Sequence, residues 1–264
     1  TGVVALGTTA APAARSAPER RAGLDVLAGV CRGRAAPLLV GANTVDAVAT
    51  LRGRPEVRAA LSVVPAFSCP GEAGVLAHFR RLAAASPVPI VVYHVPHRTG
   101  QSLSAGALRQ LAALPGVAGV KHAVGGIDDD TVALMADVPA GFAVLAGDDV
   151  FLSPLLALGA HGAITASAHV ATARFAELVE AWRTGDAARA RVLGHRLAGL
   201  ARALFAEPNP AVVKAVLHAR GEIPTAAVRL PLLPAGADTT RTALQHAETL
   251  QPAVSTQPAA AART

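Results

Sequence analysis

Val117-Ala118-Gly119-Val120-Lys121 is an apolar run that ends in one of only two lysines in this chain of 264 residues. Four consecutive apolar residues are typical of a parallel strand that is buried on both faces. A lysine at the end of such a strand is desolvated, which lowers its pKa toward the range in which an amine attacks carbonyl groups. Arginine, which supplies almost all the other basic residues, cannot lose its proton in this way. The run therefore predicts either a nucleophilic amine or a lysine that reaches solvent past a strand end.

The only tyrosine of the chain, Tyr93, ends a second apolar run in the same manner, after Pro89-Ile90-Val91-Val92. A phenol beside a reactive amine can supply and accept protons during carbonyl chemistry. Together the two residues indicate an enzyme that forms a Schiff base, with Lys121 as the amine and Tyr93 as its proton partner. The alternative is a tyrosine that packs in the core without a chemical role.

Short apolar runs alternate with longer amphipathic segments through most of the chain, which predicts βαβ units and a parallel sheet. The expected strands are Val3–Leu6, Pro37–Val40, Ala60–Val64, Pro89–Val92, Val117–Val120, Phe142–Leu145 and Ala163–Ala166. The expected helices between them are Pro18–Val30, Val45–Leu51, Gly74–Ala85, Ala105–Leu114, Asp128–Met135 and Leu152–Leu158. The pattern then predicts helices alone, at Ala171–Trp182, Ala187–Phe205, Pro210–Arg220 and near Thr242–Thr249.

Seven βα units followed by helices predict an α/β fold. The two architectures that fit are a (β/α)8 TIM barrel with extra C-terminal helices and an open doubly wound sheet. The candidate chemical residues all follow strand runs, where the active sites of barrels gather, and no dinucleotide-binding Gly-x-Gly-x-x-Gly follows the first strand. We therefore expect the barrel, with its units in residues 1–168, a C-terminal helical region in 169–234 and a disordered tail in 235–264.

The composition excludes several classes of function. A net charge of +6 would suit nucleic acid, but the arginines are spread along the chain and aromatic residues make up only 3%, so no nucleic-acid partner is expected. No apolar run approaches the roughly 18 residues of a membrane span, so no membrane association is expected. With only two cysteines, Cys31 and Cys69, and no signal-peptide pattern at residue 1, the sequence predicts a reduced, cytoplasmic setting.

Three motifs in order resemble one protein family. They are Gly7-Thr8-Thr9, the segment Tyr93-His94-Val95-Pro96-His97-Arg98-Thr99-Gly100, and Gly119-Val120-Lys121. Further matches are Gly147-Asp148-Asp149, His161-Gly162-Ala163-Ile164 and Phe205-Ala206-Glu207-Pro208-Asn209-Pro210. Over about residues 1–234 the chain resembles the dihydrodipicolinate synthase / N-acetylneuraminate lyase family of class I aldolases.

The resemblance implies a TIM barrel that forms a homo-oligomer, usually a tetramer, and that uses no cofactor and no catalytic metal. It implies that pyruvate or another 2-oxo acid forms an imine with Lys121. Tyr93 would shuttle protons, and Thr8 would belong to the same proton relay. The imine is an electron sink, so C3 of pyruvate can lose a proton and attack an aldehyde.

The resemblance also assigns substrate-binding residues. Thr9 would hold the carboxylate of pyruvate, and Ile164 would border the substrate through its carbonyl group. Arg98 would bind the carboxylate of the second substrate, which favours the synthase branch, in which pyruvate is joined to aspartate semialdehyde. Two alternatives stay open: a 2-oxo acid aldolase or dehydratase with another acceptor, and a catalytically weak paralogue.

The chain departs from the family pattern in several places. Ala10 and Ala11 replace the usual glycine and glutamate, and His94 stands where asparagine is common. Phe67 stands where the family has a second relay tyrosine, so the proton relay is expected to be broken. The match starts at the second strand of the family, so its first βα unit is expected to be missing.

Other polar residues have simpler interpretations. His94 and His122 each follow an inward-pointing residue on a strand, so both are expected to point to the outer face. Asp148 and Asp149 have no third ligand at metal-binding spacing and are expected to be structural.

Overall fold

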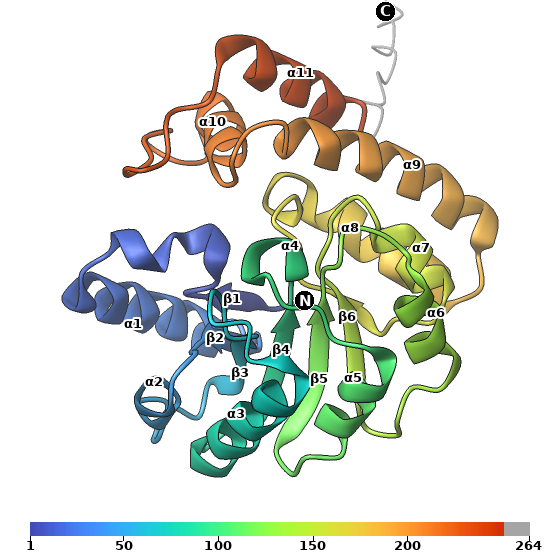
Figure 1. Ribbon diagram of the computed structural model, residues 1–264. Coiled ribbons are helices and arrows are strands. Elements are labelled where there is room, and N and C mark those ends of the chain that lie inside the picture. The colour runs from blue at the N-terminus through green and yellow to red at the C-terminus, as the bar shows by residue number, and fades with distance from the viewer. Residues whose placement is uncertain (251–264) are drawn as a thin grey trace, which may run out of the picture.

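The computed structural model describes residues 1–250 and contains one sheet of seven parallel strands (Figure 1). The strands pair in sequence order, each with its neighbours in the chain. All seven expected strands are present, although the last one ends at Ala163 rather than Ala166. Their bounds are β1 Val3–Ala5, β2 Leu38–Gly41, β3 Val57–Val63, β4 Ile90–His94, β5 Val117–His122, β6 Ala143–Ala146 and β7 Gly162–Ala163.

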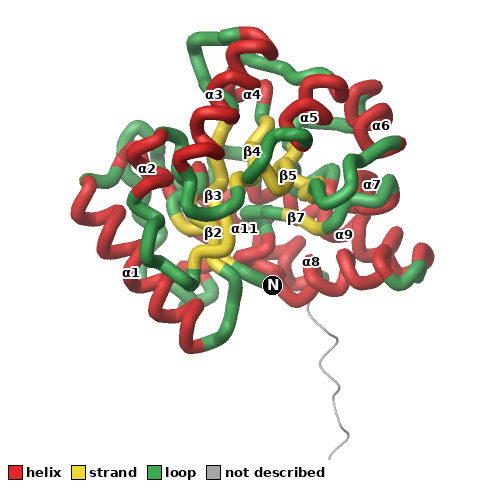
Figure 2. Tube along the Cα trace, turned by 90° about the horizontal axis from the view of Figure 1, so that it is seen from below, coloured by secondary structure: helices red, strands yellow, loops and turns green. Residues whose placement is uncertain are grey.

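Helices connect the strands and cover the outside of the curved sheet (Figure 2). Two single turns of 3-10 helix follow the first strand, η1 at Thr8–Ala10 and η2 at Pro12–Ala14. The helices of the βα units are α1 Ala17–Gly33, α2 Val45–Ala49, α3 Gly71–Ala85, α4 Pro96–Thr99, α5 Ala105–Ala112, α6 Asp129–Ala136 and α7 Leu152–Ala157. The C-terminal helices are α8 Ala168–Arg183, α9 Ala187–Leu204, α10 Ala211–Ala219 and α11 Ala237–Glu248. None of the helices in the described part of the chain is both long and apolar enough to span a bilayer.

The strand order and direction are those of a (β/α)8 barrel with seven of its units. Within residues 1–250, no ladder of hydrogen bonds joins β7 to β1. The α/β class and the curled parallel sheet therefore agree with the sequence analysis. The expectation that the first βα unit of the family is missing from this chain stays a prediction.

The two faces of the sheet bury separate sets of side chains. The outer face packs against the helices in a large core that includes Ile90, Val92 and Val120. The inner face holds a smaller cluster, formed by Ala59, Leu61, Val91, Tyr93, Val95 and Ala123. Because successive strand residues alternate between faces, Tyr93 points inward while its neighbours point out.

The C-terminal helices correct one expectation. Residues 235–264 were expected to form a disordered tail apart from a helix near Thr242–Thr249. The structure confirms a helix there, but α11 begins earlier, occupies Ala237–Glu248 and packs against α9. Ala243 and Ala247, four residues apart, are buried on one face of α11, followed by Leu250. Small alanine side chains among polar residues make a weak apolar stripe, which explains the missed boundary. Residues 251–264 lie outside the described part of the chain. In Figure 1, α9, α10 and α11 lie above the carboxyl ends of the strands.

Candidate active site

Lys121 and Tyr93 lie side by side inside the curl of the sheet, at the carboxyl ends of β5 and β4. They are direct partners in the parallel register of the two strands. Lys121 Nζ lies 4.1 Å from the centre of the Tyr93 ring, and both residues are buried, at 9% and 7% exposure. A buried amine held against a phenol has the arrangement that carbonyl chemistry needs.

Burial changes the acidity of the Lys121 amine. Desolvation lowers the pKa of Lys121 to about 8, and the charge of Arg98 adds to this effect, whereas the carboxylates of Asp149 and Asp148 oppose it. With a pKa of about 8, about a tenth of the amine is unprotonated at pH 7, against less than a thousandth for an ordinary lysine. Lys121 can therefore act as a nucleophile near neutral pH.

Burial has the opposite consequence for the Tyr93 phenol. Desolvation raises the pKa of Tyr93, and hydrogen bonding with the Thr8 side chain and the charge of Arg98 only partly offset this. Tyr93 therefore keeps its proton at neutral pH and can donate it. Thr8, which begins η1, is the side chain that hydrogen-bonds with the phenol.

The other predicted site residues come from three different strand ends. Thr9 follows Thr8 in η1, and its hydroxyl oxygen accepts a hydrogen bond from Asn209 Nδ2 at 2.9 Å. Arg98 lies in α4 after β4 and is exposed, and its charge acts on both Lys121 and Tyr93. Ile164 follows β7 and packs against the inner cluster that contains Tyr93. The structure thus places these side chains around the same end of the sheet.

Sequence reasoning missed the contribution of two carboxylates. Asp149 is buried and accepts a hydrogen bond from Ser167 N at 2.6 Å, and Asp148 accepts one from Gly125 N at 2.6 Å. These bonds fix the loops after β7 and β5, which agrees with the expected structural role. Both carboxylates also act on Lys121, whose pKa they raise. The sequence spacing gave no signal of this electrostatic effect on Lys121, because the fold brings the carboxylates near the amine. Among residues 1–250, no three His, Cys, Asp or Glu side chains are grouped to hold a metal.

Gly147 leaves room for the Lys121 side chain. A Cβ atom at Gly147 would lie 2.8 Å from Lys121 Cγ and 2.9 Å from Lys121 Cε, and 2.8 Å from Ala123 Cβ. Contacts this short force the lysine stem to move.

We expect Gly147→Ala to displace the amine and to lower kcat/KM by roughly 10²-fold, the scale of a misplacement of about 1 Å. Gly29→Ala is the matched control, because an added Cβ there has nothing within 4 Å. Steady-state kinetics of both variants checks this. Equal activity of the Gly147 variant and wild type would show that the added Cβ atom does not displace the Lys121 amine.

Comparisons of the whole chain with known proteins identify its family. Residues 1–250 match the model of the Dihydrodipicolinate synthetase family. The chain belongs to this family. It is 37% identical over 238 residues to a 4-hydroxy-tetrahydrodipicolinate synthase of Neisseria meningitidis serogroup B, with 88% of this chain and 81% of that protein covered. A protein of the same name from Methanococcoides burtonii is 35% identical, over 90% of this chain and 82% of its own length.

Solved structures of the family have the same fold. The dihydrodipicolinate synthase of Thermotoga maritima superposes with a TM-score of 0.88 at 28% identity, covering 94% of this chain and 86% of its own. The enzyme of Acinetobacter baumannii, solved in complex with pyruvate, gives a TM-score of 0.85 at 31% identity, covering 94% of this chain and 87% of its own.

The Phe67 side chain does not point toward Tyr93 and Thr8 of the same chain. Its side chain is 96% exposed, in a loop after β3 where its φ is 65°. Its backbone N–H donates to the Thr99 carbonyl at 3.3 Å, so the loop itself is held. Within one chain, Phe67 is therefore not a third member beside Tyr93 and Thr8.

The histidines that follow the two site residues face outward, as expected. His94 and His122 are paired in register and buried, with ring centres 5.4 Å apart. His94 Nε2 accepts from Leu103 N at 3.1 Å, and His122 Nε2 lies 2.8 Å from Thr131 Oγ1. Because Thr131 donates its proton to Asp128 at 2.6 Å, its oxygen accepts from His122. The pair links β4 and β5 to α6 behind the site.

This histidine pair predicts loss of stability in acid. Desolvation lowers the pKa of His94 to about 4, and the nearby His122 adds to the effect, while Asp128 and Asp130 oppose it. In the unfolded chain, His94 takes up a proton near its ordinary pKa of 6.5, whereas in the folded chain it stays neutral down to about pH 4. The free energy of unfolding is therefore highest above pH 6.5 and decreases as the pH falls toward 4. The contribution is about 3 kcal/mol. Urea unfolding at pH 7 and pH 4.5 should show this decrease in the free energy of unfolding for wild type and a smaller decrease for His94→Asn. An equal decrease in the variant would contradict the prediction.

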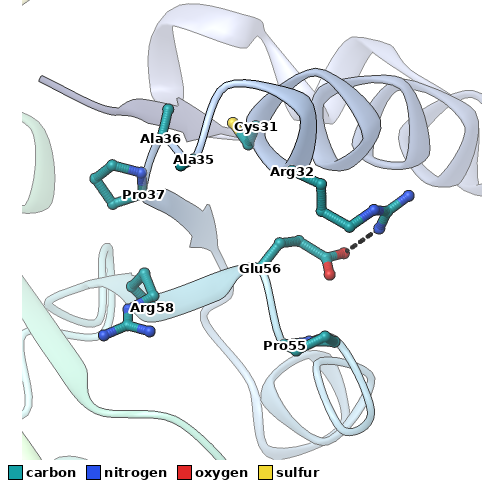
Figure 3. Close-up of a pocket in the computed structure, with 8 residues that line it drawn as sticks. All are labelled: Cys31, Arg32, Ala35, Ala36, Pro37, Pro55, Glu56 and Arg58. Carbon is teal, nitrogen blue, oxygen red and sulfur yellow. Dashed lines mark ion pairs between the residues drawn. The ribbon is translucent and has the colours of Figure 1, made fainter.

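A pocket lies at the opposite end of the sheet from these residues (Figure 3). It has a volume of about 480 Å³ and is lined by residues at the starts of β2 and β3. Arg32 and Glu56 form an ion pair of 3.3 Å in it. Because the pocket lies at the amino ends of the strands, it is separate from the site around Lys121.

Proposed function

We propose that this chain is a Schiff-base-forming synthase that condenses pyruvate with aspartate semialdehyde, the activity of a 4-hydroxy-tetrahydrodipicolinate synthase. The observation that carries the proposal is the buried Lys121 amine, with a pKa of about 8, in register with Tyr93 in a chain of this family. The names of the curated relatives support it, and so does the relative solved with pyruvate.

The residues act in sequence in this proposal. The unprotonated amine of Lys121 adds to C2 of pyruvate, and Tyr93 donates the proton with which the hydroxyl group leaves as water. The resulting imine draws electrons from C3, which loses a proton and attacks the aldehyde carbon of the second substrate. Tyr93 and Thr8 carry protons in these steps, and water then hydrolyses the imine and regenerates Lys121.

The substrate-binding residues act through their hydrogen-bonding groups. The Thr9 hydroxyl donates to the carboxylate of pyruvate, and Ile164 borders the substrate. The exposed guanidinium of Arg98 stands at the entrance and pairs with the carboxylate of the aldehyde, which it can hold with two parallel hydrogen bonds.

The test of this function is turnover with a panel of acceptors. The purified chain is incubated with pyruvate and, separately, with aspartate semialdehyde, with glyoxylate and with the neutral aldehyde propanal, and product is measured by mass spectrometry. We expect turnover to be fastest with aspartate semialdehyde. Turnover with another acceptor alone would favour an aldolase or dehydratase of different specificity, and an imine with pyruvate without turnover would favour a weak paralogue.

We expect Arg98→Ala to raise the KM for aspartate semialdehyde by roughly 10- to 100-fold, the worth of hydrogen bonds to a charged group. The KM for pyruvate should change much less. Arg98→Lys is the matched control, because it keeps the positive charge near Lys121 and loses the forked geometry. Equal rises in the two KM values would show that Arg98 supports the pyruvate site instead.

The quaternary and cellular settings belong to the same proposal. We infer a homo-oligomer in the cytoplasm. One similar solved structure, 28% identical with a TM-score of 0.86, is described as the first monomeric dihydrodipicolinate synthase variant. Light scattering of the purified chain would show whether it is a homo-oligomer or a monomer.

A further inference from the structure

The turn that carries Thr8 and Thr9 is held by two residues from the far end of the chain. Asn209, just before α10, bonds to the Thr9 hydroxyl, and Arg229, in the loop between α10 and α11, bonds to the end of the turn and to α1. We propose that Asn209 and Arg229 are positioning residues, which hold the turn over residues 8–14 in its substrate-binding shape. The proposal rests on the proposed function in one respect, the role of Thr9 as a carboxylate ligand.

The turn has few means of holding its own shape. It consists of η1 and η2, two single turns without a buried residue in either one. Ala11, which joins them, has a φ of 46°, a left-handed conformation that is unfavourable for a residue with a side chain. Without an apolar anchor, such a turn depends on polar contacts to its backbone carbonyl groups.

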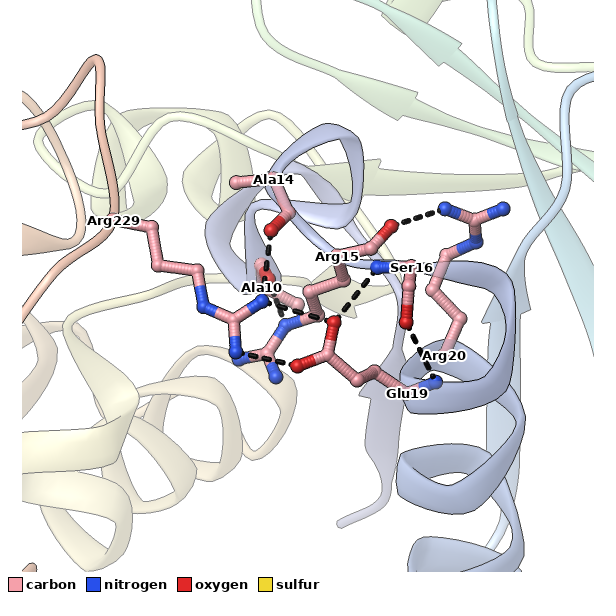
Figure 4. Close-up of polar contacts among 7 residues, drawn as sticks. All are labelled: Ala10, Ala14, Arg15, Ser16, Glu19, Arg20 and Arg229. Atoms are coloured by element: carbon pink, nitrogen blue, oxygen red, sulfur yellow. Dashed lines mark hydrogen bonds and ion pairs between the residues drawn. The ribbon is translucent and has the colours of Figure 1, made fainter.

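Three arginines supply these contacts (Figure 4). Arg15 Nε donates to the Ala10 carbonyl at 3.0 Å, and Arg20 Nη1 donates to the Arg15 carbonyl at 2.5 Å. Arg229 Nη1 donates to the Ala14 carbonyl at 2.9 Å. Arg15 directly follows the turn and Arg20 lies in α1, so among these arginines only Arg229 joins the turn to a distant part of the chain.

Arg229 is itself fixed by a two-pronged ion pair with Glu19. Its Nη1 and Nη2 lie 3.0 Å and 2.5 Å from the two carboxylate oxygens. Glu19 also accepts from Ser16 N at 2.8 Å, while Ser16 Oγ caps α1, so the carboxylate ties the start of α1 to the same arginine. The bond from Arg229 holds the pKa of Glu19 at about 2, and the pair stays ionised at neutral pH.

The direction of the Asn209 bond matters for Thr9. A hydroxyl group has one proton to donate and two lone pairs that accept. Asn209 Nδ2 donates to the Thr9 oxygen, so the hydroxyl proton of Thr9 stays free to donate to an anion. The contact therefore orients Thr9 as a donor.

The Arg229 contact should affect the turn more than the stability of the whole fold, because exposed ion pairs add little to global stability. Arg229 is 54% exposed in its side chain. This difference separates a positioning role from a merely structural one.

The first experiment compares Arg229→Gln with Arg241→Gln. The control removes an arginine that pairs with Asp238 on α11, away from the turn. Hydrogen exchange measured by mass spectrometry should show faster exchange of the amides in residues 8–16 for Arg229→Gln alone, with both melting temperatures close to wild type. Unchanged exchange in Arg229→Gln, or the same increase in both variants, would overturn the proposal for Arg229.

The second experiment compares Asn209→Asp with Asn209→Ala by the pyruvate dependence of borohydride trapping. Aspartate keeps the shape of asparagine but accepts the Thr9 proton, so we expect a larger rise in the half-saturating pyruvate concentration for aspartate than for alanine, where the rise is about three- to tenfold. A structural role predicts the reverse order, which would overturn the proposal for Asn209. If wild type forms no adduct with pyruvate, the proposed function fails. Hydrogen exchange of residues 8–16, measured for Arg229→Gln and in the same way for Asn209→Ala, then still decides whether each residue holds the turn, and unchanged exchange would overturn its role.

Discussion

Lys121→Arg should abolish both the pyruvate adduct and turnover. Arginine keeps the positive charge and much of the stem length, but its guanidinium cannot lose a proton and attack C2 of pyruvate. We expect kcat/KM to fall by roughly 10⁴-fold or more, as when a covalent nucleophile is removed. Borohydride reduction in the presence of labelled pyruvate, followed by peptide mapping, should place the label on Lys121 in wild type and nowhere in the variant.

The other lysine of the chain is the natural control. Lys214 lies in α10, and its Nζ donates to the Ala227 carbonyl. Lys214→Arg can keep that contact, so it should leave adduct formation unchanged. A label on Lys214 in wild type, or a persistent adduct in Lys121→Arg, would show that the assignment of the amine is wrong.

The pH dependence of the same reaction follows from the pKa of about 8 of Lys121. The reactive form is the unprotonated amine, so kcat/KM for pyruvate should rise with pH and level off above about 8. Arg98→Ala removes a charge that lowers this pKa, and the plateau should then move to higher pH. A profile that is flat between pH 6 and 9 would contradict a buried amine as the nucleophile.

The sequence predicted the fold and the central pair because both depend on local pattern. Seven continuous apolar runs indicated buried parallel strands, and the carboxyl ends of such strands meet at one edge. Because Tyr93 and Lys121 each end one of these runs, the sequence predicted that the two residues lie close together before the strand register was known. The alternation of side chains along a strand likewise predicted that His94 and His122 face outward.

Features that depend on distant contacts could not be predicted in this way. The bond from Asn209 to Thr9 joins residues 200 positions apart, and the fit of Gly147 against Lys121 appears only when β6 lies beside β5. The same holds for the charges of Asp148 and Asp149 on the amine. The sequence placed Phe67 where the family has a relay tyrosine, but it could not show that the loop after β3 turns this side chain into solvent.

Tyr93→Phe should slow imine formation while leaving the site in place. Phenylalanine keeps the ring that Lys121 Nζ contacts at 4.1 Å and keeps the packing of the inner cluster, so the melting temperature should stay close to that of wild type. What is lost is the phenolic proton, which the raised pKa of Tyr93 keeps available for donation. A positioned acid or base contributes about 10²–10⁴-fold, and we expect kcat to fall within that range.

The stage of the reaction that slows distinguishes this role from a structural one. In Tyr93→Phe, the rate of adduct formation before borohydride quenching should fall together with kcat, although the final amount of adduct is unchanged. Thr8→Val serves as the graded comparison, because it removes the hydroxyl that bonds to the phenol and leaves the phenol itself in place. The loss should therefore be smaller than for Tyr93→Phe. If Tyr93→Phe forms the adduct at the wild-type rate, water delivers the proton and the phenol is only a packing partner of Lys121.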